Sequence, residues 1–434
     1  MKKIFDFSNS LLKNYKNFNI EDIEIMISEN TNVSVKSRHQ KLENIERSNN
    51  SSIGINIFKD KRKATLTSNN IENTDAKEFL EKGSAMVKSM PVDEFSGLAE
   101  KEDYTANVED LDLEDTIWLD DKKLLDQASI AEESMLQNKG ITNSEGSTRS
   151  FSKNTFSIIN SKDFHASYNK TYHSISSIAI AGSDTNMQRD YEYSAAIHSN
   201  DLVSAEKVGL LAAKRATSRL NSKKIKSCSL DVIFEPRVAK SILSSFCSCA
   251  SGSSIARGTS FLNNKLDSLI FKNNVLITNN PKLKRGIGSA PYDGNGIKNE
   301  NISIVENGRL KNYFLNLRSA RQLEMKLNGN SSPYNLILNK GADALIDIYK
   351  NIKNGFLVTE MLGMSFNPLN GDYSRGAVGF KIDNGEITYP VSEVTIAGNL
   401  LEMLKNLTPA NDLLINDNIN SPSILIEGMT LAGL

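Results

Sequence analysis

Histidine and cysteine are scarce in this chain, which has 4 histidines and 3 cysteines among 434 residues. A hydrolytic zinc site needs about three protein ligands and an open position for water. None of the histidines is followed by glutamate, so no HExxH or HExxxH motif can be written. They are His39, His165, His173 and His198. The sequence therefore predicts no histidine-based zinc site, while a site built from scattered carboxylates stays open.

The cysteines are odd in number and too few for a disulfide framework, which is typical of a reducing compartment. Lys2 and Lys3 are not followed by the apolar stretch of a secretion signal. No segment approaches the ~18 uninterrupted apolar residues of a membrane helix. We therefore expect a cytoplasmic protein without a membrane partner.

An excess of charge is also missing, since the formal net charge is -1 at pH 7. Without a global positive field or a basic or aromatic stacking motif, nucleic acid is not an expected partner. Gly252-Ser253-Ser254 lacks the second glycine of a nucleophile elbow, and Gly286-x-Gly288 lacks the third glycine of a dinucleotide loop. Asp293-Gly294-Asn295-Gly296 lacks the later glutamate of a calcium loop, which favours a tight turn.

The first half of the chain alternates apolar and polar residues in several runs. The run over residues 23–27 and a second over 33–35 are separated by polar residues 29–32, which predicts a pair of strands. Residues 53–57 and 64–66 flank Asp60-Lys61 and predict a hairpin, and residues 150–198 predict further strands.

Three helices are predicted beside these strands. One begins after an N-cap at Thr74 or Asp75 and ends near Met90-Pro91. A second covers residues 121–138, and a third carries apolar residues at i+4 spacing from Val208 to Leu220. Strands covered by helices predict an α+β domain with an antiparallel sheet.

The second half is rich in turns and follows the polar, basic stretch 221–227. We place a domain boundary there, with an N-terminal α+β domain over 1–220 and a C-terminal β-rich domain over 221–434. The hairpin turns favour a barrel-like sheet, because Asn-Gly and Asp-Gly tolerate positive φ. These dipeptides are Asp293-Gly294, Asn295-Gly296, Asn307-Gly308, Asn354-Gly355, Asn370-Gly371 and Asn384-Gly385.

One pair of histidines and one pair of cysteines could be considered as metal ligands, but we interpret both pairs as residues without a functional role. His165 and His173 lie eight residues apart in a strand-like stretch, and we interpret both as surface or turn residues. Cys247 and Cys249 would share one face of a strand but not of a helix, so joint metal binding needs further ligands. We interpret these two thiols as buried and unreactive.

Several short motifs carry more information through their order and spacing. They are Ser52-Ile53-Gly54-Ile55-Asn56-Ile57-Phe58, Pro91-x-x-Glu94-Phe95-x-Gly97-Leu98, Ala250-Ser251-Gly252, Arg257-Gly258-Thr259-Ser260-Phe261-Leu262, Asn367-Pro368-x-x-Gly371-Asp372-Tyr373-Ser374-Arg375-Gly376-Ala377 and Thr395-Ile396-Ala397-Gly398-Asn399-Leu400. From about residue 20 to its end, the chain resembles the TldD/PmbA family, and specifically its PmbA (TldE) branch.

The catalytic TldD branch carries HExxxH on a helix after the central strand, and a later cysteine ligand. Here residues 235–241 follow the central strand without a histidine, and no cysteine stands near 411–413. The resemblance therefore implies the non-catalytic subunit of a cytoplasmic TldD/TldE-type zinc metalloprotease. It implies unfolded peptides as substrates, no cofactor in this chain, and zinc in a TldD-like catalytic partner subunit. A homodimer of the isolated chain stays open beside this heterodimer.

No catalytic or metal-binding residue is therefore expected in this chain. The candidates for lining an interior chamber or shaping its turns come from the shared motifs, and are Arg257, Ser260, Asn367, Gly371, Asp372 and Ser374. Within the segment 367–377 we expect a structural turn, fixed by Asp372 and Ser374 side chains. The alternative function is a regulatory or binding protein of the gyrase-modulator type without a role in proteolysis.

Overall fold

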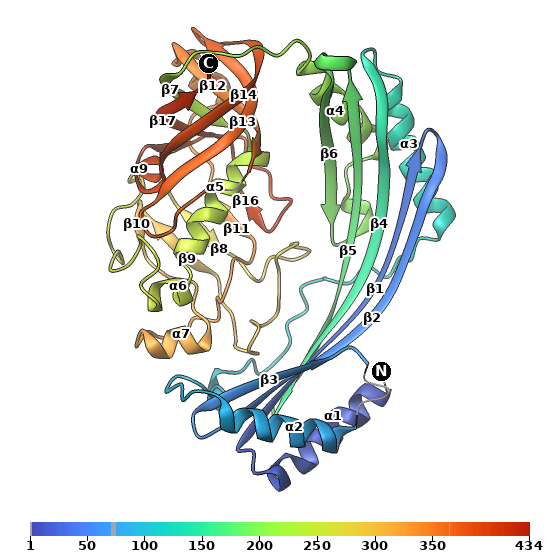
Figure 1. Ribbon diagram of the computed structural model, residues 1–434, viewed down its shortest axis with the longest axis vertical. Helices are drawn as coiled ribbons and strands as arrows, with labels where there is room; N and C mark the ends of the chain where they lie inside the picture. Colours follow the sequence, from blue (N-terminus) through green and yellow to red (C-terminus); the bar gives the residue numbers. More distant parts are fainter. Residues whose placement is uncertain (1, 71–74, 364) are drawn as a thin grey trace.

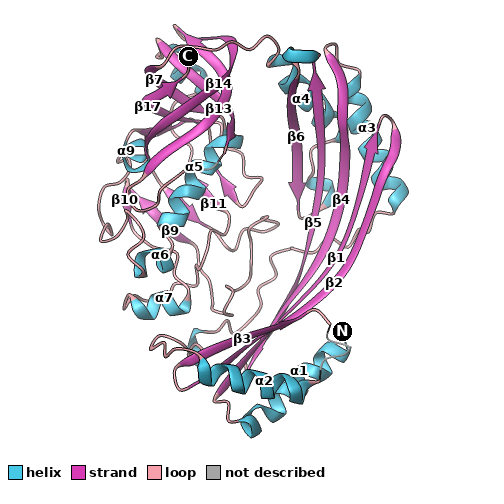
Figure 2. Ribbon diagram, viewed as in Figure 1, coloured by secondary structure: helices cyan, strands magenta, loops and turns pink. Residues whose placement is uncertain are grey.

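The computed structural model describes residues 2–70, 75–363 and 365–434. Figure 1 shows two parts: a long curved sheet from the first half of the chain, and a β-rich second part on the concave side of that sheet. Figure 2 shows the mixture of helices and strands. The predicted α+β class is confirmed.

The curved sheet is antiparallel, with strand order β3-β2-β1-β4-β5-β6. Its strands are β1 (Asp22–Arg38), β2 (Lys41–Lys59), β3 (Arg62–Ser68), β4 (Ile141–Asn160), β5 (His165–Ala181) and β6 (Gln188–Ala196). The predicted hairpin is β2 and β3, and Asp60 and Lys61 form its turn with φ of 49° and 56°. This sheet leaves β6 and β3 as its two edges.

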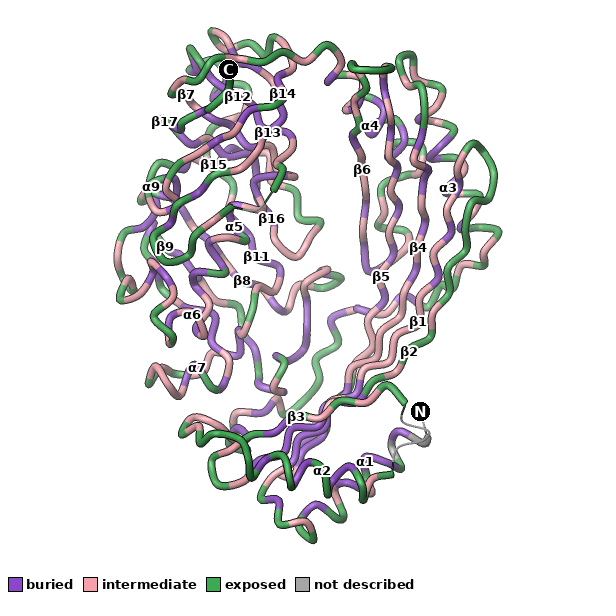
Figure 3. The backbone as a smooth tube through the Cα atoms, viewed as in Figure 1, coloured by how far each residue is buried: buried purple, intermediate pink, exposed green. Residues whose placement is uncertain are grey.

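The prediction of two strands over residues 23–35 is wrong, because β1 is continuous. Its apolar ends lie in two different clusters, one formed with residues 4–15 and 79–87 and the other with residues 119–125, and its polar middle belongs to neither cluster. Asn30 pairs there with Asn154 of β4, with its Nδ2 donating to Oδ1 at 2.7 Å. Figure 3 shows this middle of the sheet as less buried than its lower end. Polar residues therefore mark a gap between two cores, not a turn.

Helices cover the convex face of the sheet (Figure 1). They are α1 (Lys2–Asn14), α2 (Ala76–Ser89), α3 (Asp121–Leu136) and α4 (Ala205–Ser218). The last three confirm the predicted helices, and Asp75 caps α2 by accepting from the Lys77 N–H. Thr74 lies outside the described residues. No helix among the described residues is long and apolar enough to cross a membrane.

The second part contains a closed five-stranded barrel. The ring runs β14-β13-β12-β7-β17 and closes through a β14–β17 pairing. Its strands are β7 (Cys228–Phe234), β12 (Asn354–Leu362), β13 (Asp372–Asp383), β14 (Glu386–Asn399) and β17 (Ile424–Ala432), with β15 (Leu407–Pro409) beside β17. The barrel-like prediction is confirmed. The domain boundary at 220/221 stays a prediction.

A smaller sheet of order β10-β9-β8-β11-β16 packs in the same core. Its strands are β8 (Ile277–Asn279), β9 (Ile302–Glu306), β10 (Arg309–Leu310), β11 (Leu336–Leu338) and β16 (Ile419–Asn420). The helices of this part are α5 (Pro236–Cys249), α6 (Gly252–Ala256), α7 (Leu317–Gln322), α8 (Leu345–Lys350) and α9 (Leu400–Lys405). Short 3-10 helices lie at Tyr15–Phe18, Lys101–Asp103, Asp184–Asn186 and Ser199–Asp201.

Most of the predicted hairpin turns exist, but Asn354-Gly355 does not form one. These two residues begin β12, and Gly355 has no positive φ. A Cβ at Gly355 would lie 2.5 Å from Ile352 Cγ2, so glycine is needed there for close packing. The nearby turn is instead Asn384-Gly385, with φ of 49° and 88°.

Candidate functional site

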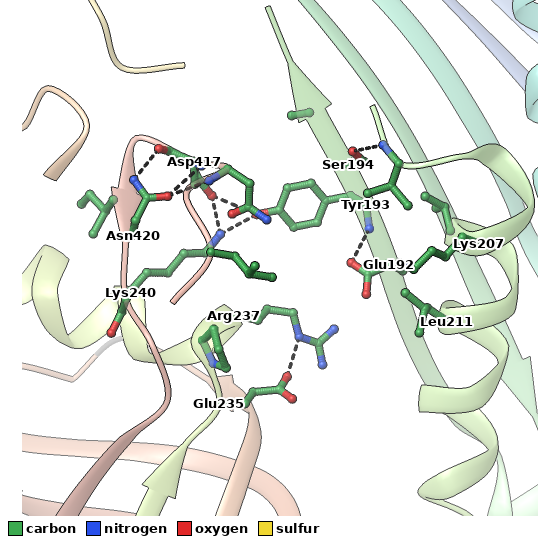
Figure 4. A pocket seen from close by; sticks show the side chains of 18 of the residues that line it. Glu192, Tyr193, Ser194, Lys207, Leu211, Glu235, Arg237, Lys240, Asp417 and Asn420 are labelled. Atoms are coloured by element: carbon green, nitrogen blue, oxygen red, sulfur yellow. Dashed lines mark hydrogen bonds and ion pairs between the residues drawn. The ribbon is translucent and has the colours of Figure 1, made fainter. Parts of the chain in front are cut away.

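A pocket of about 360 Å³ lies between the two parts of the molecule. One wall is the edge strand β6 with helix α4, and the other is the start of α5 with residues 414–421 (Figure 4). The pocket is therefore built from segments more than 200 residues apart in sequence, such as Tyr193 and Asp417, whose side chains hydrogen-bond at 2.9 Å.

Helix α5 follows the barrel strand β7 and turns one side to this pocket. Pro236 occupies its first turn, where the missing N–H removes no helical hydrogen bond. The apolar side of the helix is buried in the barrel core. Arg237 and Lys240, three residues apart, lie on the other side and line the pocket.

Arg237 is held by two carboxylates from different parts. Its Nη1 donates to Asp190 Oδ1 of β6 at 2.8 Å, and its Nε donates to Glu235 Oε1 at 2.9 Å. Burial lowers the pKa of Arg237, but the Asp190 hydrogen bond and the Glu235 charge outweigh it and raise the pKa above its ordinary value. Asp190 is also 2.9 Å from Nε of the buried Arg219. These contacts form a charged connection between sheet and barrel.

Lys240 makes a second connection across the pocket. Its ammonium group donates to the Asp417 carboxylate and to the Tyr193 hydroxyl. Burial lowers the pKa of Lys240, but both hydrogen bonds raise it, and the net pKa lies above its ordinary value. For Asp417, burial raises the pKa, and the hydrogen bond to Lys240 brings it below its ordinary value. Both groups are therefore charged at neutral pH.

The free edge of β6 runs along the pocket, and most of it is already hydrogen-bonded. The carbonyl oxygens of Arg189 and Tyr191 accept from Arg219 and Arg237 at 3.1 and 3.0 Å. The N–H groups of Tyr191 and Tyr193 donate to the carboxylates of the preceding Asp190 and Glu192. The backbone groups of alternate residues in a strand point to the same edge. The C=O of Tyr193 and the N–H and C=O of Ala195 therefore also point to the free edge of β6. That short stretch remains for main-chain pairing.

The donor set does not fit a zinc ion. Among the described residues, no group of three or more His, Cys, Asp or Glu side chains could hold a metal. The pocket side of α5 instead presents Arg237 and Lys240, whose charges oppose a divalent cation. No step of a reaction is therefore assigned to a metal in this chain.

Arg257 and Ser260 lie outside this pocket. Arg257 is exposed and ends α6 as its C-cap. Ser260 is buried, and its hydroxyl donates to Cys249 O at 2.7 Å and accepts from the Leu262 N–H at 3.0 Å. The structure thus places Ser260 as a residue that fixes the chain between α6 and the barrel.

Asn367, Asp372 and Ser374 lie together in the β12–β13 hairpin and line a separate open hollow. Gly371 has φ of 84° and donates its N–H to Asn367 O at 2.9 Å. Asp372 accepts from Asn370 Nδ2 at 2.7 Å. Ser374 bonds to Ser365 through its backbone N–H, rather than through its predicted side-chain contact.

The hairpin is tied to the Arg257 segment, since the Phe261 N–H donates to Pro368 O at 2.9 Å. The candidate residues therefore gather in one region of the second part, but none of them lines the pocket between the parts. The predicted site residues did not include the pocket residues Arg237, Lys240 and Asp417, or Asp190, which binds Arg237. The i, i+3 spacing of two cations on the polar side of α5 was the available signal.

The interpretation of His173 as a surface or turn residue is wrong. His173 is fully buried in β5, with Nε2 3.1 Å from Asp115 Oδ2 and Nδ1 3.3 Å from Arg149 Nη2. Burial and the Arg149 charge lower the pKa of His173 to about 4, so the imidazole is neutral. His165 is exposed at the start of β5.

Cys247 and Cys249 are buried in α5, in agreement with their interpretation. Burial raises the pKa of the Cys247 thiol, and it raises the pKa of Cys249 to about 11. A thiol with a raised pKa is a poor nucleophile.

Three family models match the chain. A model described as PmbA/TldA metallopeptidase domain 1 matches residues 23–87, the central domain matches 106–220, and the C-terminal domain matches 227–433. Metalloprotease PmbA of Escherichia coli O157:H7 is 32% identical over 94% of this chain and 92% of its own length. The Metalloprotease PmbA homolog of Haemophilus influenzae is 34% identical, with the same coverage of 94% and 92%.

Solved structures share the whole fold. A protein from Bacteroides thetaiotaomicron superposes with a TM-score of 0.93 at 24% identity, with 100% of both chains covered. TldE from Thermococcus kodakarensis superposes with a TM-score of 0.84 at 18% identity, over 98% of this chain and 100% of that one.

A curved sheet packed against a closed barrel, matched along most of the chain by peptidase-family models, defines a metallopeptidase-family protein. The chain belongs to the PmbA/TldD family, as its motifs predicted.

Proposed function

We propose that this chain is the subunit without a zinc site in a cytoplasmic, two-subunit metalloprotease that degrades or trims unfolded peptides. A TldD-like subunit supplies the zinc and the catalytic groups. This chain encloses one side of the substrate space and holds peptide.

The pocket side of α5 is the observation that carries this proposal. The resemblance puts the metal-binding histidines of the catalytic branch on the helix after the central strand, and α5 follows β7 in that way. Here Arg237 and Lys240 line the pocket and are bound to Asp190 and Asp417. A cation held by a carboxylate both repels zinc and uses an oxygen that could bind it.

Peptide binding is supported by the edge of β6. An extended peptide can add to a sheet edge through main-chain hydrogen bonds, which require an unfolded chain but little sequence preference. Tyr193 and Ala195 offer such groups beside the pocket, while Arg219 and Arg237 cover the neighbouring carbonyls. A peptide would therefore pair over a short stretch, and a folded protein has no free strand to offer.

Metal analysis of the purified chain tests the absence of a zinc site. The chain is dialysed without a chelator and its zinc is measured per polypeptide. We expect well under one zinc per chain, both for the wild type and for a Lys240→Met variant. Stoichiometric zinc that is lost in variants of His173 or Cys249 would contradict the proposal.

A further inference from the structure

A second cavity, of about 410 Å³, lies between the concave face of the curved sheet and loops of the second part. It shares no lining residue with the pocket beside α5. Its floor comes from β1, β2, β3, β4 and β5, and its cover comes from residues 290–294 and Tyr334.

The walls of this cavity are mainly apolar and aromatic. Three aromatic rings contact one another in sequence. The ring centroids of Phe156 and Tyr168 are 5.4 Å apart, and those of Tyr168 and Tyr292 are 5.3 Å apart. Gly54 of β2 opens the space, because a Cβ there would meet only Met26 Cε, at 3.5 Å. Ser28, Ser52 and the exposed Thr67 line the cavity as well. An apolar body therefore fits between these walls.

Asp293 is the charged group of the cavity, and one of its oxygens lacks a partner. The side chain is 1% exposed. Oδ1 accepts from the N–H groups of Asn295 and Ile297 at 2.8 and 3.0 Å. Oδ2 is buried and has no hydrogen-bond partner among the described residues. A buried carboxylate oxygen in that state is costly unless a ligand donates to it.

The surroundings of Asp293 favour a cationic ligand over a neutral one. No Lys, Arg or His lines the cavity in the part of the chain that the structure describes. The second buried carboxylate nearby, Glu24, is 3% exposed and adds negative potential. Burial and, to a smaller extent, the Glu24 charge raise the pKa of Asp293 to about 6, so Asp293 is mostly ionised at pH 7.5. The facing phenols of Tyr168, Tyr292 and Tyr334 are neutral there, because burial raises the pKa of each.

We propose that this cavity binds a primary ammonium or guanidinium group at the end of an apolar chain, with the cation donating to Asp293 Oδ2. A lysine or arginine side chain of a flexible peptide and a free alkylamine share this chemistry. The proposal does not depend on the function proposed above.

The test measures binding of n-pentylammonium to the full-length chain at pH 7.5 by ligand-observed NMR, with n-pentanol as the neutral probe of equal length. We expect saturable binding of the amine, at least about tenfold tighter than the alcohol, since a charge-assisted hydrogen bond is the main difference. Asp293→Asn should remove this preference. The asparagine keeps an amide oxygen for the two backbone N–H donors, but it has no negative charge and no second oxygen to accept from the ammonium group. Glu386→Gln, at an exposed site of β14, should leave the preference unchanged.

A second variant provides an independent test in case Asp293→Asn does not fold. Gly54→Leu places a side chain in the cavity from β2 and leaves Asp293 itself unchanged, and it should abolish binding of both probes while circular dichroism stays native. Peptides that differ only by lysine or norleucine distinguish the sources: a lysine-dependent affinity assigns a peptide side chain, and binding of the free amine alone assigns a small amine. Equal affinities for amine and alcohol, or an unchanged preference in Asp293→Asn, would overturn the proposal.

Discussion

At the residue scale, Asp190 joins the two parts of the molecule. It is buried in the edge strand β6 and faces Arg219, which follows α4, and Arg237, which opens α5. Two guanidinium groups on one buried carboxylate compensate the loss of its hydration better than one. The same arginines cover the edge carbonyls of β6, so one charged cluster fixes the pocket and limits where a peptide can pair.

Arg237→Met should destabilise the protein by about 3 kcal/mol, because it leaves Asp190 and Glu235 without one of their buried partners. Arg219 still holds Asp190, which keeps the loss at the low end of the usual range. Lys224→Met is the matched control. It breaks an exposed pair with Glu393 and should cost below about 1 kcal/mol. Urea unfolding measures both, and equal losses would show that the cluster at Asp190 is not a buried one.

His173 predicts an acid-sensitive fold. Its pKa is about 4 in the folded protein and about 6.5 in the unfolded chain, so the unfolded chain binds the proton first. The contribution of neutral His173 to the free energy of unfolding is complete above pH 6.5. It is lost as the pH falls toward 4, and the loss is roughly 2 kcal/mol at pH 5. Asp115, Arg149 and His198 face this imidazole.

The measurement is urea unfolding of the wild type and of His173→Gln at pH 7.5 and pH 5. We expect the wild type to lose more stability than the variant over this interval. Parallel losses in the two proteins would show that His173 does not titrate with a lowered pKa.

At the element scale, helices α3 and α4 pack unusually closely. A Cβ at Gly209 of α4 would lie 2.0 Å from the Ala131 carbonyl oxygen of α3. In an open helix, Gly→Ala would stabilise by about 1 kcal/mol. Here we expect Gly209→Ala to destabilise by about 2 kcal/mol, because the helices must separate. Lys214→Ala, exposed on the same helix, should be near neutral. A stabilising Gly209→Ala would contradict the close packing.

The edge of β6 gives a prediction for peptide binding. Ala195→Pro removes an N–H that points to the free edge, where proline is tolerated in a sheet. In the assembled enzyme, we expect its KM for an unfolded peptide to rise about tenfold, since main-chain pairing is weakened. Ala195→Val keeps the N–H and should preserve KM. If both variants bind peptide equally, the substrate does not pair with this edge.

Local patterns in the sequence predicted the elements that are determined mainly by residues close to one another in the chain. The i+4 stripe of α4, the Asp75 cap of α2 and the Asp60-Lys61 turn all form as expected. The continuous strand β1 was missed, since its polar middle depends on where separate helices end. The pocket was missed for the same reason: Tyr193, Arg237 and Asp417 line one pocket only because the two parts pack together.

At the scale of the whole molecule, a sheet and a barrel enclose a charged pocket in which Arg237 and Lys240 are already bound to carboxylates. Such a chain has no ligand set of its own for zinc among the described residues. Its contribution to proteolysis would be enclosure and peptide binding, which restrict an otherwise indiscriminate site to unfolded substrates.

The most direct measurement is hydrolysis of an unfolded peptide by this chain alone, by a TldD-like subunit alone, and by the two together. A fourth sample contains both chains, with the zinc-binding histidines of the TldD-like subunit replaced. We predict chelator-sensitive cleavage only when both intact chains are present. Chelator-sensitive cleavage by this chain alone, or a TldD-like subunit that is fully active without it, would contradict the account.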